Sequence, residues 1–498
     1  MKKIPLKTFL ILILVSIAIR GYMAPKYGIW EDEALTINLT GSDYTIGDVI
    51  QYCLGVDRCS FVYNIFLHFW TGIFGTGEIA AKTPSILFGA LTVGLLFLIA
   101  LHFMEEDFAL VVGVVALCSP YMIYLSTEVR PYALLGLLGT FAVLCLVKII
   151  LGSEEEKKLW MKIHAATIVI GIYTNPFMYL FWAGHLVYLL YQFKKNIKFL
   201  IPQLLILVLS IPHIFCLAGS LRQAKFISPF ESLALQKLFG VIFRLPYGFI
   251  IPSSTKDEIY TIVSSFPYVL AIGMGIFGVL TLILIGAENI KEGIKGKSWI
   301  GLGLFFLFLV WLLFPVRLSP RQCSLVIPYF FLLFGLGIAL PSPNGWHSTL
   351  KTFVITLMGF SLYFQFTGNA NPYTETNWRE VITMIDVSHK SDDNIFILID
   401  KFAPNEMNLE YTLPPEKYSG MLALFDYYSE GRITPKLIDP TELDLDKIHK
   451  GRVFILWNHL AYKKNPLPEL AKEAESIGCI LSQINYGQRL TRIAFYKK

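Results

Sequence analysis

Residues 131–151 read PYALLGLLGTFAVLCLVKIIL, a run in which Lys148 is the only charged side chain. An α-helix needs about 20 consecutive apolar residues to cross the hydrocarbon core of a bilayer. Such runs recur through the 498-residue chain, which is 16% charged, whereas soluble domains carry about 25% charged residues. The sequence therefore predicts a polytopic α-helical membrane protein, not a soluble globule, a disordered chain or a disulfide scaffold. The net charge of +5 is small and scattered, so no nucleic-acid partner is expected.

The other apolar runs set the number of spans. The first, Phe9 to Ile19, follows a basic start like that of a secretory signal, but no small-x-small cleavage site comes after it, so we expect a retained helix. The shorter aromatic segment Phe61 to Phe74 is expected to be an interfacial or re-entrant helix. With the first helix, about eleven spans are predicted. The later ones cover residues 79–103, 108–126, 131–151, 161–174, 176–193, 198–218, 264–286, 299–315, 322–340 and 350–366.

Lysines set the expected orientation, because short cytoplasmic loops are enriched in Lys and Arg. With the N-terminus inside, the inner loops carry Lys157, Lys158, Lys162, Lys194, Lys195, Lys198, Lys291, Lys295, Lys297 and Lys351. An odd number of spans then leaves residues 367–498 outside the cytoplasm. We thus expect a transmembrane domain over residues 1–366, with outer loops 25–78 and 219–263, in the plasma or inner membrane.

The tail, residues 367–498, has a different pattern. Residues 377–389 and 469–476 look helical, and short β-branched runs cover 395–399, 453–457, 479–484 and 490–496. Strands that alternate with helices predict a small α/β domain. It contains no Gly-rich phosphate loop, so a nucleotide substrate is not indicated.

Two cysteines of the first outer loop, Cys53 and Cys59, form a disulfide only if that compartment is oxidising, and this is left open. No spacing of Cys and His resembles a zinc site.

An acidic stretch, Trp30-Glu31-Asp32-Glu33, follows the first helix at the expected outer edge of the membrane. Adjacent carboxylates repel one another, and desolvation raises their pKa values further. One interpretation is a solvated acidic loop. The functional interpretation is a carboxylate near a low-dielectric surface that acts as a base or a cation ligand.

Two outer turns carry arginines. Glu128-Val129-Arg130-Pro131-Tyr132 is either an ion pair at a helix end or an anion clamp, since guanidinium presents a fixed fork of donors to phosphate. Arg317-Leu318-Ser319-Pro320-Arg321 opposes the trend of positive charge inside. Carboxylates and arginines from distant loops thus share one face of the membrane, a layout suited to chemistry on a lipid-linked anion.

The order of these segments resembles that of the GT-C glycosyltransferases of the protein O-mannosyltransferase and aminoarabinose transferase type. The resemblance runs from residue 1 to about residue 400. Its motifs are the Asp-Glu pair after the first helix, Trp70-Thr71-Gly72-Ile73-Phe74-Gly75, Glu128-x-Arg130-Pro131-Tyr132, Pro320-Arg321 and Asn377-Trp378-Arg379-Glu380.

Such enzymes move a sugar, with inversion, from a polyprenyl-phosphate carrier to a lipid, glycan or protein acceptor at the outer face. The resemblance implies that Asp32 is the general base and that Glu33 orients the acceptor or a cation. The additional acid Glu31 leaves open a shift of the base by one residue. No cofactor is assigned with certainty, and a divalent cation stays possible, because metal use varies in the family and the acidic stretch has no His to indicate zinc.

The resemblance also assigns the donor site. Arg130 and Arg321 would hold the carrier phosphate, and Glu128 and Tyr132 would shape that site. Gln322 stands where the family has an aromatic residue, which weakens the assignment of Arg321.

Three other functions compete with transfer. A transporter or flippase of lipid-linked sugars is expected to show repeated halves and polar residues near the bilayer midplane, and no repeat is visible. A lipid-linked polysaccharide ligase or polymerase uses the same donors. A receptor or scaffold with an external sensory domain is the third. An outer cavity that contains Asp32 would favour transfer.

Overall fold

The computed structural model describes residues 5–41, 43–55, 60–193, 201–223, 279–281, 283–284, 324–340, 345–367, 378–388, 390, 393–398, 420–438, 453–458, 479–486 and 490–497. The chain divides into two compact units. The first comprises Met1–Lys26, Leu39–Ile250 and Thr261–Ala370, and the second comprises Tyr27–Asn38, Ile251–Tyr260 and Asn371–Lys498. Helix α2 (Glu31–Thr40) passes from the second unit into the first.

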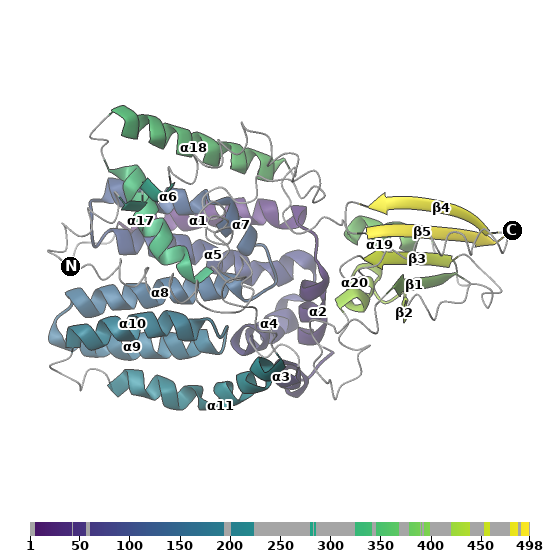
Figure 1. Ribbon diagram of the computed structural model, residues 1–498, viewed down its shortest axis with the longest axis horizontal. Helices are drawn as coiled ribbons and strands as arrows, with labels where there is room; N and C mark the ends of the chain where they lie inside the picture. The colour runs from purple at the N-terminus through teal and green to yellow at the C-terminus, as the bar shows by residue number, and fades with distance from the viewer. Residues whose placement is uncertain are drawn as a thin grey trace. The chain divides into compact units, whose positions relative to one another are not determined.

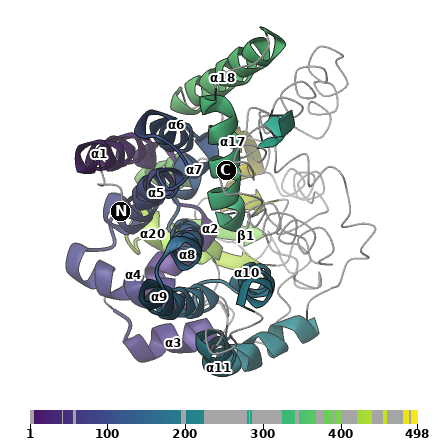
Figure 2. The same cartoon turned by 90° about the vertical axis from the view of Figure 1, so that its left-hand side faces the viewer.

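The first unit is helical (Figure 1). Its helices are α1 (Leu6–Met23) with the 3-10 turn η1 (Ala24–Lys26), α3 (Ile46–Gly55), α4 (Phe61–Phe74), α5 (Glu78–Ala100), α6 (Glu106–Leu117), α7 (Pro120–Leu125), α8 (Tyr132–Leu151), α9 (Glu154–Ile172), α10 (Met178–Phe193), α11 (Ile201–Gln223), α17 (Ile327–Ala339) and α18 (Gly345–Phe366). Helices α8, α9 and α10 run side by side, and Figure 2 shows them nearly end-on.

Three helices in the described part of the chain are long and apolar enough to cross a membrane: Leu6–Lys26, Glu78–Ala100 and Tyr132–Leu151. Shorter apolar helices cover Phe61–Phe74, Met178–Leu190, Ile201–Leu217 and Ser324–Ala339. These helices support a membrane protein. The count of eleven spans stays a prediction, because the runs at 264–286 and 299–315 lie largely or wholly outside the described residues.

Residues 108–126 were predicted to form one continuous span. That prediction is wrong in one respect, because the structure has two helices there. Helix α6 ends at Leu117, and α7 begins at Pro120. Proline cannot donate a backbone hydrogen bond to the preceding turn, and it favours the first position of a new helix. The Ser119 side chain accepts a hydrogen bond from the backbone N–H of Met122 at 3.2 Å, which caps α7. The chain is thereby broken close to the Glu128–Tyr132 turn.

A chain of buried polar side chains connects α9, α10, α11 and α17. The Trp182 indole donates to the Gln203 amide oxygen at 2.9 Å, so the Gln203 amide nitrogen donates to His164 Nδ1 at 3.3 Å. His164 Nε2 then donates to His185 Nδ1 at 2.9 Å, and His185 Nε2 donates to the Tyr329 hydroxyl at 2.5 Å. Because an indole can only donate, one end of this chain sets the tautomer of both histidines. The sequence reasoning did not single out either histidine.

The second unit contains a five-stranded sheet in the order β2-β1-β3-β5-β4. Strand β1 (Asn394–Leu398) pairs in parallel with β2 (Lys436–Ile438) and β3 (Val453–Asn458). Strand β5 (Leu490–Lys497) is antiparallel to β3 and to β4 (Cys479–Tyr486). Helices α19 (Trp378–Ser388) and α20 (Gly420–Ser429) complete the described part. The predicted strands and the predicted helix at 377–389 are present, whereas α20 and β2 were not expected. The helix expected at 469–476 lies outside the described residues.

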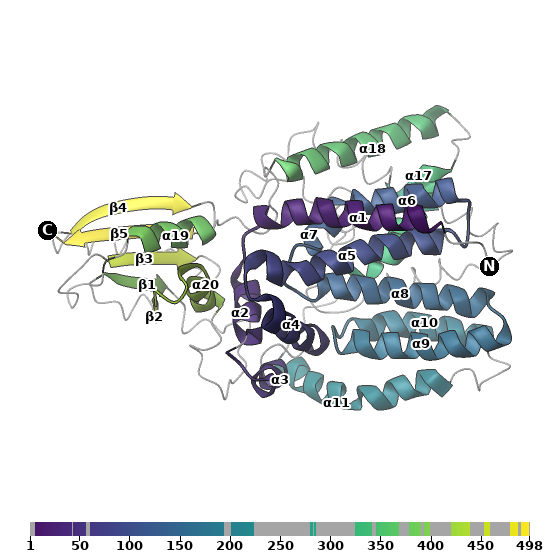
Figure 3. The ribbon, with the colours of Figure 1, turned by 180° about the vertical axis from the view of Figure 1, so that it is seen from behind.

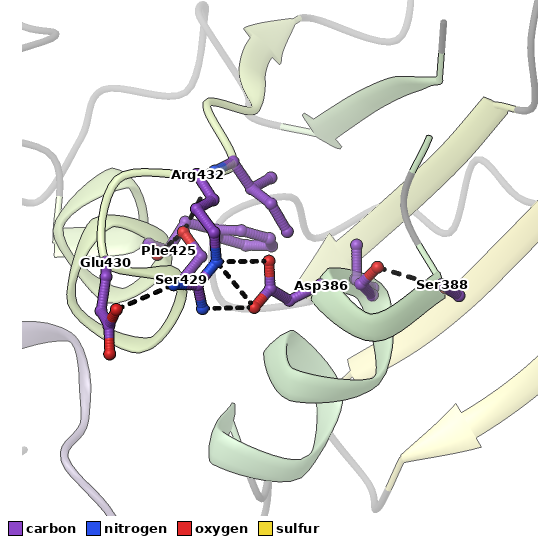
Figure 4. A network of polar contacts seen from close by, with 8 residues as sticks. Asp386, Ser388, Phe425, Ser429, Glu430 and Arg432 are labelled. Atoms are coloured by element: carbon purple, nitrogen blue, oxygen red, sulfur yellow. Dashed lines mark hydrogen bonds and ion pairs between the residues drawn. The ribbon is translucent and has the colours of Figure 1, made fainter. Parts of the chain in front are cut away.

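An exposed ion pair connects α19 to the turn after α20 (Figure 4). The Arg432 guanidinium donates to both carboxylate oxygens of Asp386, the shortest contact being 2.6 Å, and donates to Glu430 at 2.8 Å. The hydrogen bond with Asp386 is the main reason that the pKa of Arg432 is raised. Because Arg432 is 53% exposed, water screens the pair and it contributes little to stability.

Candidate functional site

The acidic stretch is the first turn of helix α2 and not a loop. Glu31, Asp32 and Glu33 open the helix, where the positive end of the helix dipole favours carboxylates. The Glu33 carboxylate accepts the backbone N–H of Trp30 at 3.2 Å, as the third residue of a capping box does. The interpretation of this stretch as a solvated loop is therefore wrong.

The three acids differ in burial. Glu33 is 1% exposed, whereas Glu31 and Asp32 are half-buried. The buried carboxylate stabilises the start of the helix. A half-buried carboxylate is more accessible to a substrate than a buried one, so Glu31 and Asp32 are both candidates, and the assignment of Asp32 as the base stays a prediction. That Glu33 orients an acceptor or a cation stays a prediction.

The turn between α7 and α8 holds the predicted phosphate-binding residues Glu128, Arg130 and Tyr132. Glu128 is 3% exposed, and its carboxylate accepts a hydrogen bond from the Tyr124 hydroxyl, one helical turn earlier. Arg130 and Tyr132 are half-buried. Pro131 is the N-cap residue of α8, and its backbone angles, φ −68° and ψ −5°, are already close to helical, so its ring fits the start of the helix. The turn thus contains a buried, hydrogen-bonded acid and a more accessible guanidinium.

Close to this turn lies a buried cation that the sequence reasoning missed. Arg20 of α1 is 0% exposed; its guanidinium donates from Nε to the Ser126 hydroxyl at 3.1 Å and from Nη1 to the Ser16 hydroxyl at 2.5 Å. Arg20 Nη2 has no hydrogen-bond partner in the described part of the chain. The position of Arg20 in the sequence could have revealed it, because a charged side chain inside an apolar helix is costly to bury and is usually functional. The predicted span ended at Ile19, which left Arg20 at its edge.

Gly89 of α5 makes room for this contact. A Cβ atom at Gly89 would lie 1.9 Å from the Ser126 hydroxyl oxygen and 3.0 Å from Arg20 Nε. We expect Gly89→Ala to lower the thermal unfolding midpoint and the yield of folded protein, because overpacking a filled core costs about 1–3 kcal/mol. Gly72→Ala is the matched control, since nothing lies within 4 Å of a Cβ atom there. A thermal scan of both variants in detergent checks this, and equal midpoints would contradict the close packing.

The predicted residues fall into three groups. Asp32 and Glu33 belong to the second unit, and Glu128, Arg130 and Tyr132 belong to the first. Arg321 and its neighbour Gln322 lie outside the described residues, as does Cys59, so the disulfide with Cys53 stays a prediction. That these groups of residues bind one substrate together therefore stays a prediction.

Two further motifs are explained by packing. Trp378 begins α19 and is 4% exposed; with Ile382 and Ile385 it forms the buried face of that helix. In α4, the Trp70 indole donates to the Ala80 carbonyl at 2.9 Å and Trp70 packs against Phe74. Among the described residues, no group of three or more His, Cys, Asp or Glu is arranged to hold a metal ion, and the metal question stays open.

Comparison with known proteins supports the resemblance. The sequence model of the dolichyl-phosphate-mannose-protein mannosyltransferase family matches residues 59–215. The fold is similar to that of ArnT from Cupriavidus metallidurans in the apo state, with a TM-score of 0.58 and 12% identity over 97% of both chains. The structure of that ArnT bound to undecaprenyl phosphate matches with a TM-score of 0.56 and 11% identity, again over 97% of both chains. No curated protein sequence matches the chain. The expected likeness to the GT-C glycosyltransferases is thereby confirmed, over residues 59–215 by sequence and over almost the whole chain by fold.

Proposed function

We propose that this protein is an inverting glycosyltransferase that moves a sugar from a polyprenyl-phosphate carrier to a lipid, glycan or protein acceptor at the outer face of the membrane. The observation that carries the proposal is the acidic first turn of α2 in a chain with an ArnT-like fold. There a half-buried Asp32 stands beside a buried, capping Glu33. The bound undecaprenyl phosphate of the similar ArnT supports a carrier of the same chemical class.

In this mechanism Asp32 takes the proton from the acceptor hydroxyl or amine as that group attacks the anomeric carbon. The carrier phosphate leaves from the opposite face, which inverts the configuration. Its negative charge grows in the transition state, so Arg130 and Arg321, placed at the phosphate, stabilise the transition state more than the bound donor. The buried Glu128 and the half-buried Tyr132 shape the turn that presents Arg130.

The donor needs no nucleotide-binding fold, because the phosphate ester already activates the anomeric carbon. Helices that span the bilayer admit the polyprenyl chain from the side, whereas a soluble enzyme would have to enclose it. The described apolar helices suit this arrangement. Transport of a lipid-linked sugar would leave the bond between sugar and phosphate intact, and that difference separates the two functions experimentally.

The test is direct. Purified protein is incubated with a panel of radiolabelled polyprenyl-phosphate sugars and with membrane extract as the source of acceptors. We expect label to move to an acceptor and free polyprenyl phosphate to appear in equal amount. Movement of intact donor across a vesicle membrane, without cleavage, would show a transporter instead.

The orientation gives a separate prediction. The lysine bias, together with an odd number of spans, predicts that residues 367–498 lie outside the cytoplasm. A reporter that is active only in the cytoplasm, fused after Lys498, is expected to be silent, and a reporter that is active only outside is expected to work. The reverse pattern would place the acidic turn on the cytoplasmic side and overturn the proposed site.

A further inference from the structure

The chain entering the acidic helix is held by α20, a helix of the second unit. The backbone N–H of Ile29 donates to the Tyr428 hydroxyl oxygen at 2.7 Å, and the same hydroxyl donates to the Ile29 carbonyl at 3.2 Å. One side chain thus satisfies both backbone groups of a residue that is 1% exposed. Ile29 lies three positions before Asp32, so this contact fixes the backbone from which α2 starts.

A second contact holds the other side of the acidic turn. Asn38, near the end of α2, donates from its side-chain amide to Asp426 at 3.2 Å and to the Ala423 carbonyl at 3.5 Å. Ile29 and Asn38 flank the acids on both sides, and all of these contacts come from α20. Helix α2 is therefore attached to α20 on both sides of the acids, although about 400 residues of sequence separate the two helices.

Gly28 shows how closely the two segments approach. A Cβ atom at Gly28 would lie 3.3 Å from the Tyr428 hydroxyl oxygen, which is tighter than ordinary contact. Any larger residue at position 28 therefore pushes against the group that holds Ile29.

We propose that Tyr428 is a positioning residue for Asp32, so that the C-terminal unit holds the base in place for sugar transfer. The inference rests on the proposed function. It gives the C-terminal unit a role in sugar transfer, although the sequence of that unit contains no Gly-rich phosphate loop. Tyr428 acts through the backbone of Ile29 and takes no part in proton transfer. Its expected effect is on the order of tenfold in kcat, because a displacement of about 1 Å at a reacting group costs up to about a hundredfold.

The experiment compares Tyr428→Phe with Arg432→Gln in the full-length protein. Tyr428→Phe keeps the ring and removes the hydroxyl. Arg432→Gln breaks the exposed bonds to Asp386 and Glu430 in the same unit and leaves Ile29 untouched. We expect a roughly tenfold lower kcat in Tyr428→Phe with unchanged binding of a polyprenyl-phosphate sugar. A modest drop in the unfolding midpoint is expected as well, because the buried backbone groups of Ile29 lose the hydroxyl. Arg432→Gln is expected to have normal kcat.

A double variant tests the local geometry. Gly28→Ala alone is expected to lower kcat, because its methyl group displaces the Tyr428 hydroxyl. In the Tyr428→Phe background that hydroxyl is gone, so Gly28→Ala should add no further loss. Fully additive losses would contradict the proposal, since they would mean that the two positions act separately.

The outcomes separate the inference from the function on which it rests. Normal kcat in Tyr428→Phe, while Asp32→Asn is inactive, overturns the positioning role and leaves the transferase standing. Equal losses of kcat in Tyr428→Phe and Arg432→Gln, with lowered unfolding midpoints, show a general loosening of the unit and also overturn it. Full activity of Asp32→Asn would contradict both the assignment of Asp32 as the base and the positioning role of Tyr428.

Discussion

Replacing Asp32 by asparagine is expected to reduce sugar transfer by at least about a hundredfold, because a positioned general base contributes about 10²–10⁴-fold. Asparagine keeps the size of the side chain and can still lie at the start of α2, so the fold should survive. Binding of the polyprenyl-phosphate sugar should change little, since the base contacts the acceptor. Initial rates with the radiolabelled donor and a direct binding measurement check the two parts separately.

The matched control is the neighbouring acid. Glu31→Gln makes the same change from carboxylate to amide at the first residue of the same helical turn, also at a half-buried position. It is expected to leave most of the activity. If Glu31→Gln abolishes transfer and Asp32→Asn does not, the base has been assigned one residue too late. Loss in Glu33→Ala with a lowered unfolding midpoint would reflect the lost hydrogen bond from the Trp30 backbone N–H, which caps the helix.

The membrane helices show what an apolar run can predict. Residues 131–151 form α8 (Tyr132–Leu151) almost as expected, because burial of an uninterrupted apolar segment decides the structure with little help from other contacts. The run at 108–126 was equally apolar, but its backbone is broken where Ser119 caps α7 and Pro120 starts it. Apolar content alone does not report such a break, whereas the Ser-Pro pair does.

The C-terminal part shows the limit of reasoning from pattern. Strand β1 and helix α19 carry strong local signals, and both were predicted. Helix α20 has ten residues, too few to be stable in isolation, so its helical state depends on contacts such as those of Tyr428 with Ile29. These contacts join segments that are far apart in the sequence, and no local pattern contains them.

The candidate site, too, could be predicted only in part from local sequence patterns. The types of residue expected there, an acid at the start of α2 and an arginine before α8, were visible as motifs. Their environments were not visible: the contacts of the buried Glu128 and of the fully buried Arg20 are made with side chains from other turns or helices. Of these residues, Arg20 could most readily have been identified from the sequence, because a charged residue beside an apolar run is costly to bury and is usually functional.

The second large effect is expected at the donor phosphate. Arg130→Lys keeps the positive charge but removes the planar fork that grips two phosphate oxygens. If Arg130 holds the carrier phosphate, affinity for the polyprenyl-phosphate sugar should fall by about tenfold, in line with the loss of one charge-assisted hydrogen bond. Normal expression and an unchanged unfolding midpoint would show that the fold is intact. Titration of the variant with a fluorescent or radiolabelled donor measures the change.

The competing role for Arg130 is an ion pair with Glu128, and the same variant separates the two. Lysine preserves a simple ion pair, and such a pair, where exposed, is worth only about 0–1 kcal/mol. The buried Glu128 carboxylate already accepts the Tyr124 hydroxyl, so Tyr124→Phe disturbs the acid without touching the arginine. A loss of donor affinity in Arg130→Lys and in Arg321→Ala, with a much smaller loss in Tyr124→Phe, supports a clamp built from both arginines. Unchanged affinity in Arg130→Lys and Arg321→Ala would remove the clamp, and the case for a transferase would then depend on the acidic turn of α2 alone.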